Sequence, residues 1–477
     1  MSGQALGPSR RDALPLDTVT DSEYPLGMSD KPYRCSGTSS RFLLRAGCSF
    51  GGLLISVGLS SSAQMDANGG HASRSFKVPP GASSVVSFTT APDAQCLIRE
   101  GNAKASGEAL PVFADDGGTV VFYVETENRA GGRAKLTASC SSQPEQTIEI
   151  EAVPGTKPAS YSQIAPGLHG TRGKHIRPAL AGDPMSLSRH ELVRRGYPMR
   201  PDPDESPDAY AAWLRAVSKP ATEIEPKLIR MPNRFHGALK VENGPAGSSN
   251  WSGYALVGTS SPFDFISGNW NVPATFGSQL GKTIYSALWI GLDGAGSANV
   301  VQDGTGQDVL SFVSDATTWI IRSYYGWKEI CCQEPEVRLS NFPVSPGDEI
   351  NSYVWMADSS GNISAYGNMA YFWFEDVTTG QYAYLSTPFT SGTFSGNSAE
   401  WIMERPTVNN SLTDIANYAV AVLWNPWAHR ADNRWYGYTG GDEITSQQIT
   451  MFNGANALST VSPLNVDHMQ FQWLASH

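Results

Sequence analysis

An all-β fold is predicted by this sequence, because its apolar residues fall in short runs that turn residues separate. From Ser248 to the C-terminus, runs such as "TIYSALWIGL", "EINSYVWMA" and "AYFWFEDV" are divided by Gly, Asn, Asp, Ser and Pro. Helix signals nearly vanish over this region, and several strands at such spacing indicate a β-sandwich or a β-barrel. Trp and Tyr are frequent in these strands, which favours a buried core over a ligand-gripping sheet face.

A smaller β domain is predicted over residues 75–153. The runs "SSVVSFTT" and "GTVVFYVET" alternate apolar and polar residues, with Gly, Pro and Asp between the runs. Cys96 and Cys140 lie at the two ends of this segment and are candidate disulfide partners in an exported protein. Cys331 and Cys332 are adjacent, and two interpretations stay open: a strained vicinal disulfide or two buried thiols.

Two short helices are predicted between the β regions, each from its start signal. Ser188 and Glu191 have the spacing of a capping box. Ser206 followed by Pro207 opens the run "DAYAAWLRAV", since proline fits the first helical position. The segment from residue 220 to residue 245 is irregular again and is predicted to be a cleavable connector. We expect its basic residues to be exposed to proteases: Lys227, Arg230, Arg234 and Lys240.

The N-terminus carries a weak signal-peptide pattern. Arg41 and Arg45 precede a modest apolar run from Phe50 to Leu59, and small residues follow before Gln64. Export is therefore expected, although a disordered tail with a chance apolar stretch is the alternative. No run of eighteen apolar residues exists, so a conventional transmembrane helix is not expected. The predicted segments are a tail (1–74, with the signal-like part at 41–64), a small β domain (75–153), a linker (154–185), a helical propeptide with its connector (186–247) and a catalytic domain (248–477).

Charge is divided unevenly along the chain. From Ser248 onward there are 7 Lys and Arg against 20 Asp and Glu, which is a net charge of −13, whereas the remainder carries +2. A nucleic-acid-binding surface would need basic clusters, which this half lacks. Carboxylates that protonate near pH 4 relieve the self-repulsion of such a domain, which favours a protein that tolerates acid.

The absent motifs narrow the chemistry. There is no "GxSxG" elbow, no "HExxH" and no phosphate-binding loop. After Ser248 the only histidines are His429, His468 and His477, so a histidine triad or a zinc site has little to draw on. An enzyme in this region has to work with carboxylates, amides and hydroxyls.

The run "SAEWIMERP" holds Glu400 and Glu404. On a strand these two and Ile402 share one face, and Trp401 and Met403 share the other. The two carboxylates would lie roughly 13 Å apart at the rise of a strand. That separation exceeds the one used by glycosidase carboxylate pairs. A catalytic role for either carboxylate therefore needs a partner from another strand.

Six motifs in order resemble the glutamic peptidase family, the eqolisins, between Ser248 and His477. They are "SSNWSGYAL", "ALWIGLDG", "VVQDG", "YYGWKE", "VSPGDEI" and "AEWIMERP". The resemblance implies a concanavalin-like sandwich of two antiparallel seven-stranded sheets and a catalytic dyad of Gln302 and Glu400. It also implies that Trp289, Asp293 and Glu329 line the substrate cleft. Asp303 departs from the family pattern, in which a threonine commonly follows the glutamine.

The implied activity is that of a secreted acid endopeptidase acting on polypeptides, with neither metal nor cofactor. Glu400 would deprotonate a water and later protonate the leaving amine, and Gln302 would donate its amide N–H to the oxyanion. The N-terminal region, with its +2 charge, would bind the acidic domain as an intramolecular propeptide until acidification. Nothing in the sequence demands more than a monomer.

Two other functions remain possible interpretations of the sequence. One is a secreted carbohydrate-binding sandwich whose aromatic residues stack on sugars. The other is a glycoside hydrolase on a similar sandwich, with Glu400 as the acid. The "NWS" at Asn250 and the "NIS" at Asn362 are glycosylation sequons, relevant in a eukaryotic secretory host.

Overall fold

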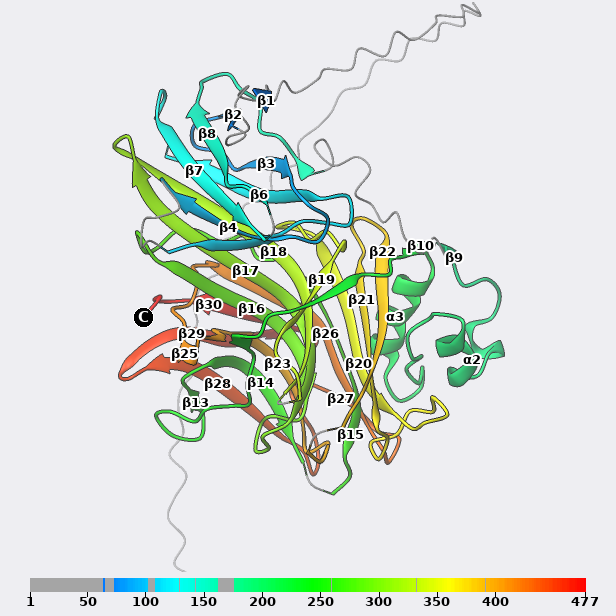
Figure 1. The fold of residues 1–477 in the computed structure, drawn as a ribbon. Coiled ribbons are helices and arrows are strands. Elements are labelled where there is room, and N and C mark those ends of the chain that lie inside the picture. Colours follow the sequence, from blue (N-terminus) through cyan, green and yellow to red (C-terminus); the bar gives the residue numbers. More distant parts are fainter. Residues whose placement is uncertain are drawn as a thin grey trace, which may run out of the picture. The chain divides into compact units, whose positions relative to one another are not determined.

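The computed structural model describes residues 63–64 and 73–477, apart from 102–107, 128, 142, 162–175, 259, 332 and 391. Ser60–His477 form one compact unit. The fold is all-β, as predicted, with two short α-helices among the described residues (Figure 1). None of the described helices is long and apolar enough to cross a membrane. Most of the predicted signal-like segment, 41–64, lies outside the described residues.

Seven antiparallel strands of the C-terminal region form the sheet that we call the front sheet. It contains most of the family motifs. Its neighbouring strands pair over five or more positions, except β18 and β19, which pair at two. In spatial order its strands are β28 (Thr445–Asn453), β14 (Trp251–Val257), β23 (Ser398–Glu404), β16 (Thr283–Leu292), β17 (Val300–Ser314), β18 (Thr317–Cys331) and β19 (Val337–Ser340).

Seven further antiparallel strands form the back sheet. Strand β28 of the front sheet also pairs with β29, so the two sheets are joined at one edge. The strands of the back sheet, in spatial order, are β29 (Asn456–Asn465), β30 (His468–Trp473), β26 (Val420–Arg430), β15 (Phe263–Asn271), β20 (Glu349–Ala357), β21 (Met369–Asp376) and β22 (Gln381–Pro388). The short β27 (Trp435–Gly437) pairs with β26.

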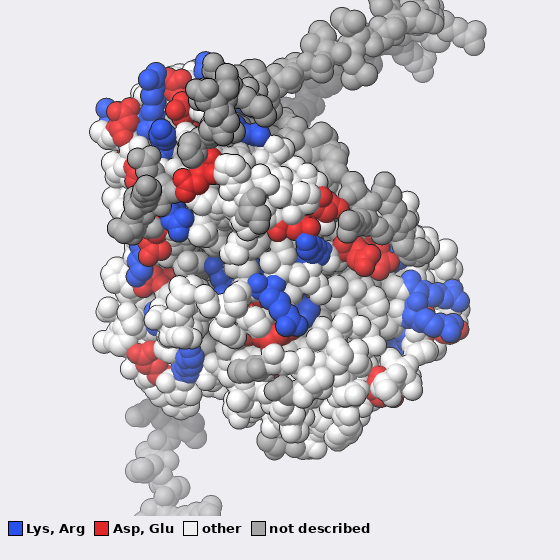
Figure 2. Space-filling view, in the orientation of Figure 1, with Lys and Arg blue, Asp and Glu red and all other residues white. Residues whose placement is uncertain are grey.

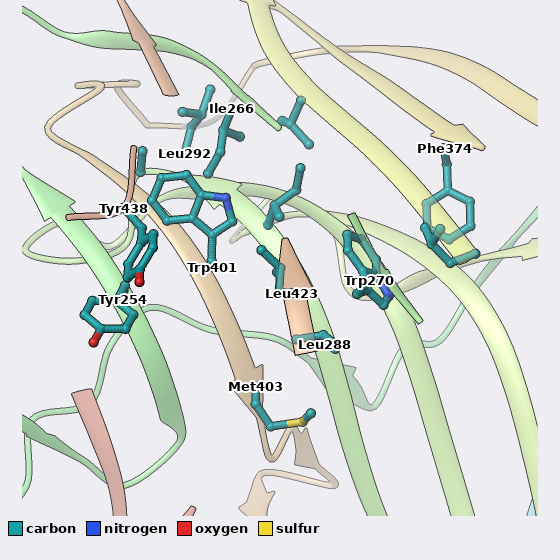
Figure 3. Packing of buried hydrophobic residues seen from close by; sticks show 14 of the residues in the cluster. Tyr254, Ile266, Trp270, Leu288, Leu292, Phe374, Trp401, Met403, Leu423 and Tyr438 are labelled. Carbon is teal, nitrogen blue, oxygen red and sulfur yellow. The ribbon is translucent and has the colours of Figure 1, made fainter. Parts of the chain in front are cut away.

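The main hydrophobic core lies between these two sheets (Figure 3). Trp401 and Met403 of β23 are fully buried in it. Ile402, between them in sequence, packs in a separate cluster on the opposite face of the front sheet. The alternation predicted from "SAEWIMERP" is therefore confirmed, and Glu400 and Glu404 share the outer face with Ile402.

Tryptophan residues from Ser248 onward are mostly core, which was the favoured interpretation of their abundance. A sugar-stacking platform needs exposed ring faces, whereas these side chains are out of contact with solvent. The fully buried ones are Trp251, Trp270, Trp289, Trp319, Trp327, Trp355, Trp373 and Trp401.

The acidic residues of the C-terminal region are also largely internal. On the face drawn in Figure 2, charged residues are scattered between wide uncharged areas. Twelve of the twenty are buried: Asp264, Asp293, Asp303, Asp308, Glu329, Glu334, Glu336, Asp348, Glu375, Asp376, Glu400 and Glu404. Attraction between the acidic and basic parts of the chain therefore has to come from individual buried ion pairs.

The strands of the small β domain surround a hydrophobic core that the C-terminal region shares. Leu310 and Phe312 of β17 and Trp319 and Ile321 of β18 are buried in this core. A disulfide joins Cys96 to Cys140 as expected, and Cys331 is also disulfide-bonded, so it is not a free thiol. Cys332 lies outside the described residues. The N-terminal strands are β1 (Ala63–Gln64), β2 (Ser73–Val78), β3 (Ser84–Thr89), β4 (Gln95–Glu100), β5 (Leu110–Phe113), β6 (Thr119–Thr126), β7 (Arg133–Cys140) and β8 (Gln146–Ala152).

The small β domain also continues the front sheet directly. Strand β6 pairs with the first half of β18, at Trp319 to Arg322, and β3 pairs with β6. Strands β1, β2, β8, β7, β4 and β5 form a separate sheet of their own. The domain is therefore attached to the C-terminal region by main-chain pairing as well as by the shared core.

Both predicted helices are present, as α2 (Arg189–Arg194) and α3 (Pro207–Val217). The capping box of Ser188 and Glu191 is confirmed, since each side chain bonds the other's backbone N–H. Ser206 precedes α3 without a side-chain capping bond. The turn η1 (Pro184–Ser186) precedes α2, and the strands β9 (Ile176–Arg177) and β10 (Ala221–Glu223) extend the back sheet beside β22.

A segment that we call the strap, residues 231–240, crosses the outer face of the front sheet. It follows β11 (Lys227–Arg230), which pairs with β19, and it contains β12 (Arg234–Phe235). Strand β12 pairs with β24 (Thr407–Val408), which pairs with β25 (Ser411–Leu412), and β13 (Gly247–Ser248) follows the strap. The prediction that Arg234 is exposed was wrong. Its exposed fraction is 3%, because its guanidinium forms ion pairs with the buried carboxylates of Asp308 and Glu336.

Candidate active site

Strand register brings three of the predicted site residues into one row on the outer face of the front sheet. Glu400 on β23 is opposite Gly291 on β16, and Gly291 is opposite Gln302 on β17. Gln302 in turn is opposite Glu329 on β18. Residues far apart in the sequence therefore meet on four neighbouring strands.

Gly291 keeps open the space between Gln302 and Glu400. A Cβ atom at this position would lie 3.0 Å from the Cβ of Gln302 and 2.9 Å from Cζ3 of Trp289. Any side chain here would therefore enter the position between the amide and the carboxylate. The "WIGLD" motif supplies this glycine as well as the tryptophan.

Gln302 is fully buried and binds the main chain of the strap. Its Nε2 donates a hydrogen bond to the carbonyl oxygen of His236, with a distance of 2.6 Å. Its Oε1 has no hydrogen-bond partner among the described residues. The amide thus holds a peptide carbonyl with its donor and keeps its acceptor available.

Glu400 is fully buried, with one oxygen engaged and one unengaged. Its Oε1 accepts a hydrogen bond from the N–H of Ala295 at 3.2 Å, and its Oε2 has no partner within the described part of the chain. Burial raises the pKa of this carboxyl well above its ordinary value, and the nearby charge of Asp293 acts in the same direction. Burial under the strap therefore favours the protonated form of Glu400.

Glu329 and Trp289 also face the strap region. Oε2 of Glu329 accepts the N–H of His236 at 2.9 Å, and burial raises the pKa of Glu329 well above its usual range. The indole N–H of Trp289 donates to Oε2 of Glu404 at 2.8 Å. Glu404 therefore anchors the tryptophan, in line with the supporting position of the second acid in the motif.

Asp293 is turned toward a loop and away from the strap. Its Oδ1 accepts from the hydroxyl of Ser395 at 2.8 Å and from the N–H of Asn397 at 2.9 Å, and its Oδ2 accepts from the N–H of Ser395 at 2.7 Å. This carboxylate fixes the chain that leads into β23 and hence the position of Glu400. In this structure Asp293 positions the site, and its oxygens are not presented to the strap.

Asp303, which departs from the family pattern, faces the opposite side of the front sheet. It accepts a hydrogen bond from the hydroxyl of Ser352 on β20 of the back sheet. Burial raises its pKa well above the ordinary value. The acid next to Gln302 in sequence is therefore separated from the dyad by the sheet itself.

A cluster of charged residues that the sequence analysis missed surrounds the upstream part of the strap. Arg234 makes two hydrogen bonds to Asp308, of 2.8 and 3.1 Å, and Arg338 donates to the same carboxylate at 2.9 Å. Tyr325 donates its hydroxyl to Asp308 at 2.9 Å, and Nε of Arg338 donates to Glu336 at 2.9 Å. Every member is buried, so the cluster binds the strap away from competing water.

The side chain of His236 lies between Glu336 of this cluster and Glu404 of β23. Its Nε2 is 2.7 Å from Oε2 of Glu336, and its Nδ1 is 3.2 Å from Oε2 of Glu404. Its ring stacks on Trp327 with 3.7 Å between centroids. Burial opposes the charge of the ring, but the two carboxylates outweigh that effect and raise the pKa of His236 to about 9.

Asn250 is a second group that the sequence analysis missed. Its Nδ2 donates to the carbonyl oxygens of Gly237 and Ala238, at 3.4 and 3.2 Å, and its Oδ1 accepts the N–H of Lys240 at 2.9 Å. The signal was present in the first motif, "SSNWSGYAL", where Asn250 was interpreted only as a sequon. With an exposed fraction of 1%, its side chain has no room for a glycan in the folded protein.

Across the described residues, no group of three or more His, Cys, Asp or Glu side chains is arranged to hold a metal ion. What the site offers is an amide donor that holds a peptide carbonyl, with carboxylates of raised pKa in the same row of the sheet. On a β-sandwich, this arrangement defines the class of hydrolases that act on peptide bonds with amide and carboxylate side chains.

Comparison with known proteins identifies the family of this domain. Residues 249–473 match the model of the Peptidase A4 family. This C-terminal part of the chain belongs to that family and is a glutamic endopeptidase domain, so the resemblance read from six motifs is confirmed. No curated protein matches the chain.

Several solved structures are similar to the chain. Scytalido-glutamic peptidase with a transition state analog inhibitor is 20% identical, with a TM-score of 0.38, and the same peptidase with a peptide based analog is 21% identical, with a TM-score of 0.36. SCP-B, a member of the Eqolisin family in a complex with the tripeptide Ala-Ile-His, is 20% identical, with a TM-score of 0.34. Each match covers 47% of this chain and 98% of the other.

Proposed function

We propose that the C-terminal domain hydrolyses peptide bonds at acid pH with Gln302 and Glu400 as its catalytic dyad. The observation that carries this proposal is the hydrogen bond of 2.6 Å from the Gln302 amide to the carbonyl oxygen of His236. A carbonyl held in this way has its oxygen at a donor that stabilises negative charge in a tetrahedral intermediate. Glu400 is held in the same row of the sheet, one strand beyond Gly291.

The two unengaged acceptors suit the attacking water. Oε1 of Gln302 and Oε2 of Glu400 are buried without partners in the described structure, and each could accept one O–H of a water. Glu400 takes the proton of that water as it adds to the carbonyl carbon, and then gives the proton to the leaving nitrogen. Water that enters the cleft brings the pKa of Glu400 back toward its ordinary value, where one carboxyl can perform both transfers.

We further propose that the enzyme is made as an inactive precursor and exported. The strap occupies the amide of Gln302, so an added polypeptide cannot reach this amide while the strap is bound. The disulfide between Cys96 and Cys140 suits an oxidising compartment, which favours export together with the signal-like segment 41–64. Residues N-terminal to the dyad-bound carbonyl act as an intramolecular propeptide.

The proposed function is tested by cleavage of a denatured protein from pH 2 to pH 7 after incubation at pH 4. The wild-type chain should cleave at acid pH only. Gln302→Ala should lose about 10²- to 10³-fold in rate, and Glu400→Gln about 10²- to 10⁴-fold. Asp303→Asn is the matched control, because its carboxyl faces the other side of the sheet.

Equal cleavage by the wild type and both dyad variants would contradict the assignment of the dyad. An intact chain that is fully active after incubation at pH 4, with no new N-terminus, would contradict the precursor.

A further inference from the structure

The strap is bound in the manner of a peptide substrate. Its main chain is held on both sides of one bond, the peptide bond between His236 and Gly237. On the upstream side, the N–H of His236 donates to Glu329 and its carbonyl oxygen accepts from Gln302. On the downstream side, Asn250 donates to the carbonyl oxygen of Gly237.

We propose that the bond His236–Gly237 is the first substrate of this enzyme, cut within the same molecule, and that the pockets holding His236 and Arg234 make it a peptidase for peptides with basic residues before the cut bond. This inference rests on the proposed function, since it assigns the carbonyl at Gln302 to the reacting bond.

The pocket for the residue immediately before the cut bond takes a flat cation. Glu336 and Glu404 each contact one ring nitrogen of His236, and Trp327 covers the ring face. Two acceptors on opposite edges and an aromatic surface below form a site for an imidazolium. An uncharged side chain here would leave the carboxylate of Glu336 partly uncompensated, which disfavours it.

A second pocket takes the residue two positions further upstream. Arg234 is bidentate to Asp308, and its guanidinium lies 4.7 Å from the centroid of the Tyr285 ring. A planar fork on a carboxylate with an aromatic face beside it distinguishes arginine from lysine. Its occupant and that of the first pocket are separated by Phe235, as alternate residues of an extended segment are.

The side that follows the cut bond is held mainly through the main chain. Asn250 bonds the carbonyl oxygens of Gly237 and Ala238, and the N–H of Leu239 donates to Gly294 at 3.1 Å. A Cβ added at Gly237 would meet no atom within 4 Å. Selectivity for the residue after the cut bond is therefore weak, and the charged pockets before it dominate.

The step is a hydrolysis, and its atoms balance with one water. The entering water hydrates the Glu400 carboxyl and lowers its pKa toward the ordinary value, so that Glu400 is ionised in part of the molecules at pH 4. The water oxygen forms a bond to the carbonyl carbon of His236, and the ionised Glu400 takes one of the protons of the water. The carbon–nitrogen bond then breaks, and the nitrogen of Gly237 receives the proton from Glu400. The products are a carboxyl group on His236 and an amine on Gly237.

Acidification leaves the strap seated, which favours cleavage in place. Burial raises the pKa of Glu336, but Arg234, Arg338 and His236 outweigh it and lower that pKa to about 2, whereas the pKa of His236 is raised to about 9. The stabilisation from Glu336 is full above its ordinary value of 4.5 and is lost only toward pH 2. The stabilisation from His236 is full below 6.5 and is lost as pH rises toward 9.

The first test identifies the earliest bond cut in the full chain. The chain is shifted from pH 7 to pH 4, sampled at early times, and analysed by intact mass and N-terminal sequencing, with Glu400→Gln as the uncleaved control. We expect a new N-terminus at Gly237, formed at a rate independent of protein concentration.

The inference would be overturned if the earliest cleavage occurred at another bond, or if its rate were proportional to protein concentration. If the enzyme still cleaved an added protein, the proposed function would stand. Failure to cleave any added protein would instead remove the proposed function, and the inference with it.

The second test uses added peptides and an unaltered enzyme, so it does not depend on the folding of a variant. A peptide of residues 230–242 is compared with the same peptide carrying His236→Ala, and with one carrying Arg234→Ala. Loss of a hydrogen bond to a charged group predicts kcat/KM lower by about 10- to 100-fold for each change, because one such bond contributes about 1.5–3 kcal/mol. Equal turnover of all three peptides would overturn the assignment of the pockets.

Discussion

The two outer faces of the sandwich are both covered by the N-terminal part of the chain, but by different physics. On the back sheet, Arg177 is fully buried, 5.1 Å from the ring centroid of Trp373 and 5.3 Å from that of Tyr382, and forms an ion pair with Glu375. On the front sheet, the strap is held by amide and carboxylate groups that bind its main chain and two of its basic side chains. The first contact resembles a domain core, and the second resembles a bound peptide.

This difference indicates which of the two contacts another peptide could replace. Apolar packing around one buried cation is selective for one partner and has no groups aimed at a peptide bond. Main-chain hydrogen bonds at Gln302, Glu329 and Asn250 can be remade with another peptide. The back-sheet contact therefore fixes the N-terminal region, and we propose that substrates replace the front-sheet contact.

The largest expected effect follows from the core that the small β domain shares with β17 and β18. After cleavage of the strap, we expect the two pieces to remain together in size-exclusion chromatography at pH 4 in 1 M NaCl, because salt does not weaken apolar packing. Trp319→Ala should weaken the association by about 3–5 kcal/mol. Separate elution of the wild-type pieces would show that the N-terminal region is released.

Removing the buried guanidinium of Arg177 from the back sheet is expected to lower the free energy of unfolding strongly. Arg177→Met leaves Glu375 buried without its guanidinium, so the free energy of unfolding in urea should fall by about 3–5 kcal/mol. Arg189→Met is the matched control, because its pair with Asp202 is partly exposed, and it should cost at most about 1 kcal/mol. Equal effects of both changes would mean that the back-sheet contact is not anchored at Arg177.

The corresponding change in the strap should cost less. Arg234→Met leaves Asp308 with two partners, Arg338 and Tyr325, so we expect a loss of about 1–3 kcal/mol in the uncleavable Glu400→Gln background. The measurement is urea unfolding at pH 5, beside Arg177→Met in the same background. A larger loss for Arg234 than for Arg177 would reverse the comparison between the faces.

A smaller effect, per unit of pH, is expected from Asp303, whose carboxyl faces the back sheet. The pKa of Asp303 is raised by burial, so the native state keeps a proton that the unfolded state releases above 3.8. Stability from this group is present below that value and is lost as pH rises, by about 1.4 kcal/mol per pH unit until its folded pKa is reached. Asp303→Asn should flatten the fall in unfolding free energy between pH 4 and pH 7. An unchanged slope would show that Asp303 is ionised in the folded protein.

Much of the fold could be predicted because it depends on local patterns. Alternation in "SAEWIMERP" placed Glu400 on the face opposite Trp401, and the helix starts at Ser188 and Pro207 were visible as caps. The order of the motifs gave Gln302 as a candidate, which has no local signal of its own, and strand register places it in one row with Glu400.

The strap could not be predicted, because its conformation depends on distant partners. The segment around His236 has no periodicity. It is held by contacts of the His236 ring to Glu336 and Glu404, which lie 100 and 168 residues away in the sequence. Arg234 looked exposed for the same reason, since its anchor Asp308 is 74 residues away. Local sequence rules do not contain such pairings.

The most direct test of the central claim is whether Gln302 and Glu400 act as one unit on one carbonyl. The measurement is kcat/KM at pH 4 for Gln302→Ala, Glu400→Gln and the double variant, each on a peptide of residues 230–242. We expect the double variant to be no slower than the slower single variant, because residues that serve the same transition state lose their effect together. Losses that multiply in the double variant would show two independent effects, and would contradict the dyad.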